Sequence, residues 1–376
     1  MTTVLVAYAP GPGHCNTLLP IAEDLAAHPG CRVYLCGSQA AARFASTGSL
    51  HVQHRPAGFE SYLRSSSGIS GDEIIRRMGR RSRRDIGRLI TELRPDVIVC
   101  DTSERGAVVA ACDHSVPFLR VVSCADAATP HGSAEEARRR ALVRGNDAND
   151  LRSPLNLGTV AFGPLWFFSG KEQARENLRC YRYQSRSPGT TVPTDFSQPQ
   201  RPRALISFGT FITEPPAKVL GSALLGLIDA GITSITMKVR DARKRALLRA
   251  WAHYLNTRTG ANISVTADLN LLHHLAHAEV LLCHGSATST LEALYRGVVP
   301  IIAPAHGDTL FVARSSAEAH VGVVIDPANN CVRRQVHTAA SMALHSPRIA
   351  AGIESFTAAN NELPPITTLV DHLIPE

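Results

Sequence analysis

The sequence has no apolar run close to the roughly 18 residues that a membrane-spanning helix needs, and no basic segment precedes its first apolar stretch. That stretch stops at Pro10, so it is interpreted as a buried strand and not as a signal peptide. The nine cysteines are an odd number and form no CxxC or CxxH pair, which favours free thiols in a reducing compartment. We therefore expect a cytoplasmic protein without a membrane partner.

Charge is also scarce, at 19% of 376 residues against 44% hydrophobic residues. This composition is typical of a globular protein with a large core, and a prior of about 150 residues per domain suggests two or three domains. The net charge of +7 is moderate, and seven arginines between residues 76 and 88 supply much of it. An apolar stripe at helical spacing runs through this segment, so it is either a solvated amphipathic helix or a patch for an anionic partner. We expect no nucleic-acid partner.

Short apolar runs alternate with amphipathic segments along most of the chain, which is typical of parallel sheets covered by helices. Early helices are predicted over residues 18–27 and 73–93. The predicted strands are 4–8, 32–36, 97–100 and 118–122, then 205–207, 234–239, 263–265, 280–283, 299–302 and 321–325.

A stretch without periodicity, QSRSPGTTVPTDFSQPQRPR, divides the chain near its middle. Its Pro, Ser, Thr and Gln content predicts an interdomain linker over residues 184–203. We predict an α/β protein with Rossmann-like doubly wound domains over residues 1–183 and 204–354, facing each other across a cleft. A C-terminal helix within residues 355–376 is expected to pack back on the first domain.

The segment CHGSATSTLEALYRGVVPIIAPAHGDT follows a predicted strand with a turn of small residues. Small residues let an anion approach the backbone N–H groups at a helix start, where the helix dipole favours negative charge. Thr288 and Ser289 add hydroxyl donors. The simpler alternative is that this stretch is only a helix cap, but a cap explains neither His284 nor Glu292.

HGSATSTLEAL resembles the donor-binding motif of the family 1 glycosyltransferases, followed here by GVVP and, at its far end, by Asp308. The resemblance implies the GT-B fold and a nucleotide-sugar donor. It implies that the diphosphate is held by His284, Thr288 and Ser289, the ribose by Glu292 and the sugar by Asp308. The small turn residues Gly285 and Ser286, the neighbouring Thr309, and Gly209 and Thr210 of SFGT complete the expected donor site.

Two departures from the family pattern concern the donor. Thr309 replaces the usual glutamine, and the TADLNLLHH region has no tryptophan to stack on a base. A dTDP-linked deoxy- or amino sugar is therefore as plausible as a UDP-sugar.

GPGHCNTLLPIAEDL resembles the family's opening segment and places His14 on the loop after the first strand. PDVIVCDTSERG places Asp101 at the carboxyl end of another strand, whereas Asp96 at its start has a structural role. The resemblance implies that His14 is the base that deprotonates an acceptor hydroxyl and that Asp101 orients it. The alternative for Asp101 is a cap for the following helix.

No metal or other cofactor is expected, because the DxD motif of metal-dependent transferases is absent. His273 and His277 stand four apart but have no further ligand at a recognised zinc spacing, so they are interpreted as solvent-facing.

The sequence thus predicts an inverting, metal-independent glycosyltransferase, a monomer or homodimer. Its partners are a UDP- or dTDP-sugar donor and a small-molecule acceptor, such as a secondary metabolite in antibiotic biosynthesis. The alternatives are a nucleotide-sugar epimerase on the same fold and a non-catalytic nucleotide-sugar-binding protein.

Overall fold

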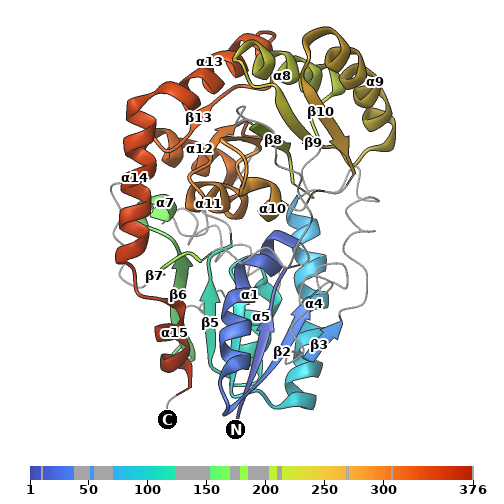
Figure 1. The fold of residues 1–376 in the computed structure, drawn as a ribbon. Coiled ribbons are helices and arrows are strands. Elements are labelled where there is room, and N and C mark those ends of the chain that lie inside the picture. Colours follow the sequence, from blue (N-terminus) through green and yellow to red (C-terminus); the bar gives the residue numbers. More distant parts are fainter. Residues whose placement is uncertain are drawn as a thin grey trace. The chain divides into compact units, whose positions relative to one another are not determined.

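The computed structural model describes residues 1–9, 12–37, 51–54, 71–123, 153–169, 178–184, 203–209, 214–267, 269, 271–305 and 308–374. The chain divides into two compact units, and Figure 1 labels most of their helices and strands. Unit 1 contains Met1–Arg182 and returns for Glu362–Glu376, and unit 2 contains Tyr183–Asn361. The segment predicted as a linker lies outside the described residues, except for its ends.

Unit 1 is built on a parallel sheet with the strand order β3-β2-β1-β4-β5-β6-β7. Because the order reverses direction beside β1, the carboxyl ends of β1 and β4 are neighbours, which is where ligands bind in open α/β sheets. The strands are β1 (Thr2–Ala7), β2 (Cys31–Gly37), β3 (His51–His54), β4 (Val97–Asp101), β5 (Phe118–Val121), β6 (Asn156–Phe162) and β7 (Leu178–Tyr181).

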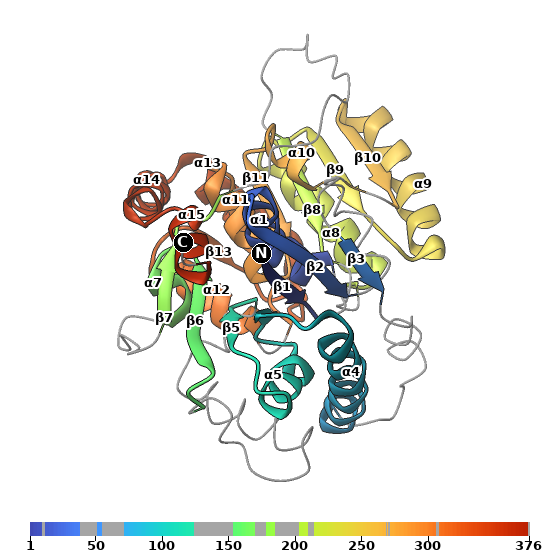
Figure 2. The same ribbon diagram turned by 90° about the horizontal axis from the view of Figure 1, so that it is seen from below.

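Helices cover the unit 1 sheet with apolar faces. α4 and α5 lie side by side (Figure 2) and bury a cluster that includes Ile86, Ile98 and Phe118. α1 contacts β2 and also α15, although α15 lies near the other end of the chain. The helices of this unit are α1 (Pro12–Ala27), α4 (Gly71–Leu93), α5 (Arg105–Asp113), α7 (Leu165–Ser169) and α15 (Ile366–Leu373).

Unit 2 repeats the design with the parallel order β10-β9-β8-β11-β12-β13. The strands are β8 (Arg203–Ser207), β9 (Ser234–Lys238), β10 (Asn262–Thr266), β11 (Val280–Cys283), β12 (Val299–Ile302) and β13 (Val323–Val324). The helices are α8 (Ala217–Asp229), α9 (Ala242–Thr259), α10 (Leu271–Leu275), α11 (Ala287–Tyr295), α12 (Asp308–Glu318), α13 (Val332–His345) and α14 (Pro347–Glu362).

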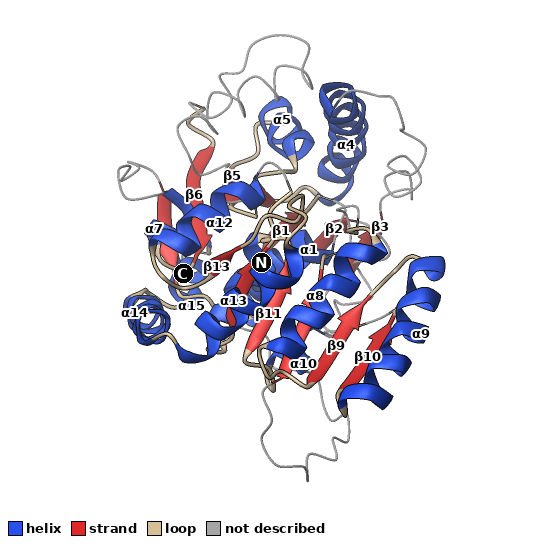
Figure 3. Cartoon of the chain, turned by 90° about the horizontal axis from the view of Figure 1, so that it is seen from above, coloured by secondary structure: helices blue, strands red, loops and turns tan. Residues whose placement is uncertain are grey.

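One face of the unit 2 sheet is covered by α8, α9 and α13, and Figure 3 shows α8 and α9 lying over β9 and β10. The core between them contains Leu224, Met237 and Val336. α9 has clear local boundaries: Asp241 accepts a hydrogen bond from the Lys244 backbone N–H at the start, and Gly260 ends the helix in the left-handed conformation.

The structure departs from the sequence prediction at several elements. α1 begins at Pro12, six residues before the predicted start, which suits a proline because the first helical N–H needs no partner. Strands β3, β6 and β7 were not predicted. In the described part of the chain, no helix has the length and apolar character to cross a membrane, and the cysteines described are free.

Candidate functional site

Three polar side chains meet at the carboxyl edge of the unit 1 sheet. Asp101 is the last residue of β4, Ser123 follows β5 closely, and His14 lies in the first turn of α1, after β1. His14 Nδ1 is 3.3 Å from Asp101 Oδ2 and 3.2 Å from Ser123 Oγ. The Ser123 hydroxyl also donates to Asp101 Oδ1 over 3.1 Å. The sheet order therefore brings together three residues that are distant in the chain.

Asp101 is fully buried and is surrounded by donors. The Ala9 N–H donates to its Oδ2 over 2.6 Å, and the Ser103 N–H donates to its Oδ1 over 2.5 Å. Burial is the largest single influence and by itself would raise the pKa of Asp101. The charge and hydrogen bond of His14 and the two backbone bonds together outweigh it, so the pKa is lowered. Asp101 is a buried, ionised carboxylate.

This arrangement can orient a histidine for proton transfer. Asp101 faces Nδ1 of a ring that is 23% exposed, so Nε2 is the nitrogen directed to other partners. A carboxylate in this position favours one tautomer and stabilises the imidazolium that forms when the ring takes a proton.

The structure corrects the predicted position of His14 and excludes the alternative role of Asp101 as a helix cap. His14 lies on α1 and not on a loop, because the helix begins before it. Asp101 does not cap α5, whose N-cap residue is Glu104. Asp96 accepts a hydrogen bond from the Thr3 N–H over 2.7 Å, a structural link between the starts of two strands.

The lowered pKa of Asp101 predicts a pH-dependent contribution to stability. A carboxylate with a depressed folded-state pKa stabilises the fold fully above its ordinary value, and this contribution is lost as the pH falls through the folded-state pKa. Asp101→Asn removes that titration. We expect the gap in melting temperature between wild type and variant to narrow as the pH falls from about 6 to about 3. A difference in melting temperature that stays constant over this pH range would contradict a lowered pKa of Asp101.

A second cluster forms at the carboxyl ends of β8 and β11 in unit 2. Gly209 follows β8 and has φ of +72°, and a Cβ built on it would lie 2.6 Å from Cε1 of His284. His284 follows β11 and is buried. Gly285 also has positive φ, +85°, and a Cβ there would lie 2.6 Å from the Ile302 side chain. Both glycines are required for the close approach around His284.

α11 begins directly after this turn. Ser286 is its N-cap residue and accepts from the Ser289 N–H over 3.4 Å, so the capping interpretation is correct for Ser286. Thr288 and Glu292 are four residues apart and therefore lie on one face of the helix. Both Thr288 and Ser289 are half-buried, whereas Glu292 is buried.

The remaining predicted donor residues lie at the start of α12 and after β8. Asp308 is the first residue of α12, where a carboxylate suits the helix dipole. Thr309 is buried, and its hydroxyl accepts from the Ala305 N–H over 3.1 Å. A Cβ on Gly285 would lie 3.4 Å from the Thr309 carbonyl oxygen, so the two turns adjoin. Thr210 lies outside the described residues.

The contact between Gly209 and His284 predicts a measurable difference between two glycine substitutions. Gly260 has nearly the same φ, +69°, but nothing within 4 Å of an added Cβ. Alanine should strain the backbone at both positions, whereas Gly209→Ala must also displace the His284 ring. We expect Gly209→Ala to cost about 1–3 kcal/mol more in unfolding free energy than Gly260→Ala. Equal losses in thermal or urea unfolding would refute the contact.

Among the described residues, no group of three or more His, Cys, Asp or Glu side chains is placed to hold a metal ion. His273 lies edge-on to His274 and to His277, with ring centroids 5.4 Å and 5.8 Å apart.

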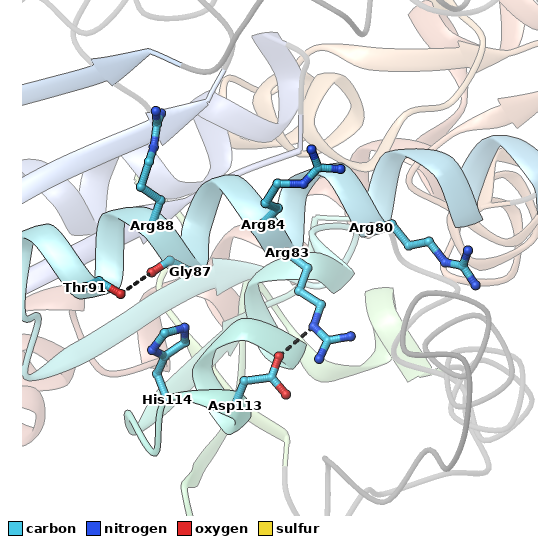
Figure 4. Close-up of a pocket in the computed structure, with 8 residues that line it drawn as sticks. All are labelled: Arg80, Arg83, Arg84, Gly87, Arg88, Thr91, Asp113 and His114. Carbon is cyan, nitrogen blue, oxygen red and sulfur yellow. Dashed lines mark hydrogen bonds and ion pairs between the residues drawn. The ribbon is translucent and has the colours of Figure 1, made fainter.

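The arginine-rich segment forms α4, in which Ile86, Leu89 and Ile90 are buried while Arg80, Arg84 and Arg88 are exposed. These exposed arginines are compatible with both interpretations, a solvated helix face and a patch for an anionic partner. Figure 4 shows these side chains beside a groove of about 330 Å³, into which Arg83 reaches from α4 to donate to Asp113 over 2.6 Å. Partly exposed ion pairs of this kind contribute about 1 kcal/mol or less.

No family model matches the sequence, and no curated protein does. Solved structures do match the fold. The glycotransferase of kitacinnamycin has a TM-score of 0.77 at 17% identity, over 99% of this chain and 98% of its own. SnogD, a glycosyltransferase from Streptomyces nogalater, has a TM-score of 0.73 at 16% identity, over 99% and 98%.

A third similar structure is the spinosyn rhamnosyltransferase SpnG complexed with thymidine diphosphate, with a TM-score of 0.70 at 18% identity, over 99% of this chain and 100% of its own. The fold is GT-B. The prediction of a two-domain α/β protein of this class is therefore confirmed.

The sequence does not predict two residues that belong to the polar clusters of units 1 and 2. Ser123 bonds both members of the His14–Asp101 pair, and the only signal for it is a polar residue just after a buried strand. Tyr183 donates its hydroxyl to Glu292 Oε1 over 2.6 Å. It precedes the predicted linker directly, and no motif marks it.

Proposed function

We propose that this protein is an inverting glycosyltransferase that moves a sugar from a nucleoside diphosphate to a hydroxyl of a small-molecule acceptor. The observation that carries the proposal is the pair of half-buried His14 and buried Asp101 at the carboxyl edge of one sheet in a GT-B fold. The helix start at residues 284–289 supplies the matching anion site in the other unit. Neighbouring glycosyltransferases with thymidine diphosphate bound support a nucleotide-sugar donor.

The donor site is assigned to residues of unit 2. Backbone N–H groups at the start of α11, together with His284, Thr288 and Ser289, hold the diphosphate and stabilise the negative charge that grows as it leaves. Glu292 accepts hydrogen bonds from hydroxyl groups of the nucleoside sugar, and Asp308 accepts hydrogen bonds from hydroxyl groups of the transferred sugar. The proposal includes no metal or other cofactor, because these groups supply the electrostatic stabilisation.

The acceptor step is assigned to unit 1. Nε2 of His14 takes the proton of the acceptor hydroxyl while the acceptor oxygen forms a bond to the anomeric carbon. The bond from that carbon to the diphosphate oxygen breaks on the opposite face, and the nucleoside diphosphate leaves with its electron pair. A single displacement inverts the configuration, and Asp101 stabilises the imidazolium meanwhile.

A thermal-shift panel of UDP, dTDP, GDP and ADP tests the donor assignment. A nucleotide present at about 100 times its dissociation constant stabilises the protein by about 2.7 kcal/mol, which raises the melting temperature by several degrees. We expect such a shift with one or two of the nucleotides, and a shift smaller by about half or more in His284→Ala. The absence of any shift at millimolar concentration would refute the proposed function.

A further inference from the structure

Ser123 lies between the two members of the His14–Asp101 pair. Its Oγ is 3.2 Å from His14 Nδ1 and donates to Asp101 Oδ1 over 3.1 Å. Asp101 Oδ2 is 3.3 Å from the same ring nitrogen. Both contacts of Nδ1 are longer than the usual N–H···O hydrogen bond of about 2.9–3.0 Å. Neither oxygen therefore holds the ring alone, and the serine is as close to Nδ1 as the aspartate is.

The single hydrogen of the Ser123 hydroxyl decides the direction of these contacts, because it can be donated to one neighbour only. Burial, the largest influence, would raise the pKa of Asp101, but the charge and hydrogen bonds around it lower it. Asp101 is thus an ionised carboxylate that can only accept. A hydrogen bond to a charged acceptor is roughly twice as strong as one between neutral groups, so the hydroxyl hydrogen goes to Asp101. Ser123 can then only accept from Nδ1, which must carry a hydrogen.

The position of the Ser123 hydroxyl is set by the residues that follow β4. The Ser123 N–H donates to Thr102 Oγ1 over 3.4 Å, and Ser103 Oγ lies 3.3 Å from Ser123 Oγ. Ser103 is the donor in the second contact, because the hydrogen of Ser123 is already on Asp101. The buried Ser123 hydroxyl therefore donates once, to Asp101, and accepts twice, from Ser103 and from His14.

The tautomer of His14 depends on the two oxygens that face Nδ1. A neutral imidazole carries its hydrogen either on Nδ1 or on Nε2. With the hydrogen on Nε2, the lone pair of Nδ1 would face the lone pairs of both oxygens, or the serine would have to give up its bond to Asp101. With the hydrogen on Nδ1, both oxygens accept it and the lone pair stays on Nε2. A base that takes a proton through Nε2 needs this Nδ1–H tautomer.

We propose that Ser123 is a positioning residue that, together with Asp101, keeps the hydrogen of neutral His14 on Nδ1 and the lone pair on Nε2. Asp101 alone offers one long contact, and Ser123 adds a second acceptor at nearly the same distance. The consequence for sugar transfer rests on the proposed function, whereas the tautomer is a property of the protein without substrate.

NMR of the full-length protein with ¹⁵N-labelled histidine tests the inference, because the shifts of the ring nitrogens report the ratio of the two tautomers. Comparison with His14→Ala assigns the signals of His14. At alkaline pH, where the ring is neutral, we expect Nδ1–H to be the main form in the wild type. In Ser123→Ala the ratio of Nδ1–H to Nε2–H should fall by roughly 2–10-fold, the value of one hydrogen bond between neutral groups.

Ser82→Ala is the matched control. Ser82 is a buried serine of the same unit, and its hydroxyl also donates to a carboxylate, that of Glu104. The variant loses the same kind of hydrogen bond, but one that does not involve His14, so it should keep the wild-type ratio of tautomers. An equal change in both variants would indicate a general effect on packing and would overturn the role of Ser123.

The outcomes also separate the two proposals. A wild type with mainly Nε2–H overturns this inference whether or not the variant folds, and so does an unchanged ratio in a folded Ser123→Ala. Neither measurement uses a nucleotide. The expected tautomers, combined with no shift in melting temperature for any nucleotide, would leave the assignment of the tautomer standing and refute the proposed function.

Discussion

His14→Ala is expected to lower kcat/KM for sugar transfer by about 10²–10⁴-fold, the usual contribution of a positioned general base. The ring proposed to take the acceptor proton is removed, whereas the proposed donor residues of unit 2 are untouched. The affinity for the nucleoside diphosphate should therefore stay within a factor of about two. Steady-state kinetics and a parallel calorimetric titration measure the two effects separately.

Two further variants sharpen this test. Asp101→Asn keeps the volume of the buried side chain but replaces one acceptor oxygen with an NH₂ group. Both carboxylate oxygens of Asp101 accept a backbone hydrogen bond, from Ala9 N–H and from Ser103 N–H, so one of these bonds is lost in the variant. Its loss of activity should approach that of His14→Ala, and the double variant should be little worse than either, because the pair acts as a unit. His28→Ala, directly after the C-terminal end of α1, is the control. Full activity in His14→Ala would refute the role of the pair.

His284→Ala is expected to weaken nucleoside diphosphate binding by roughly 10–100-fold, the value of a hydrogen bond to a charged group. His284 is buried and a Cβ on Gly209 would meet its ring, so in the proposed donor site it would be a preorganised donor for the diphosphate. Titration of dTDP into the folded variant measures the loss. His273→Ala, on α10 of the same unit, removes a histidine outside the cluster and should bind as the wild type does. Equal affinity in wild type and His284→Ala would remove the residue from the donor site.

The elements that the sequence predicts best are those whose own residues determine them. β11 and β12 have the predicted boundaries, because each is a continuous buried apolar run with a polar or turn residue beside it. β3, by contrast, is HVQH, with one strongly apolar residue, and its conformation comes from pairing with β2. β6 contains Gly158 and Thr159 and is likewise specified by its neighbours in the sheet.

The helix start at His14 shows a different limit. Pro12 and Gly13 suggest a loop, yet α1 includes them, as well as Pro20 of the predicted helix. A proline costs nothing at the first helical position, whereas Pro20 loses the hydrogen bond to the carbonyl of Asn16 and its ring crowds that carbonyl. The contacts that α1 makes with β2 and α15 offset that loss, and they are not visible in local sequence.

The residues of the candidate site likewise differ in how far the sequence predicts them. Residues within one motif, such as His284, Gly285 and Glu292, are marked in the sequence by the resemblance of that motif to a known donor-binding segment. Ser123 and Tyr183 contact their partners across the fold, and the hydrogen bond from Tyr183 to Glu292 joins residues 109 positions apart. A single sequence contains no signal for such a pair.

The central claim is that this chain transfers a sugar from a nucleoside diphosphate. Release of the diphosphate from a panel of dTDP- and UDP-hexoses, in the presence of pooled phenol and alcohol acceptors, tests it most directly. The account predicts release that depends on an acceptor, yields a product of inverted anomeric configuration and falls by about 10²–10⁴-fold in His14→Ala. No acceptor-dependent release from any donor, or a product of retained configuration, would contradict it.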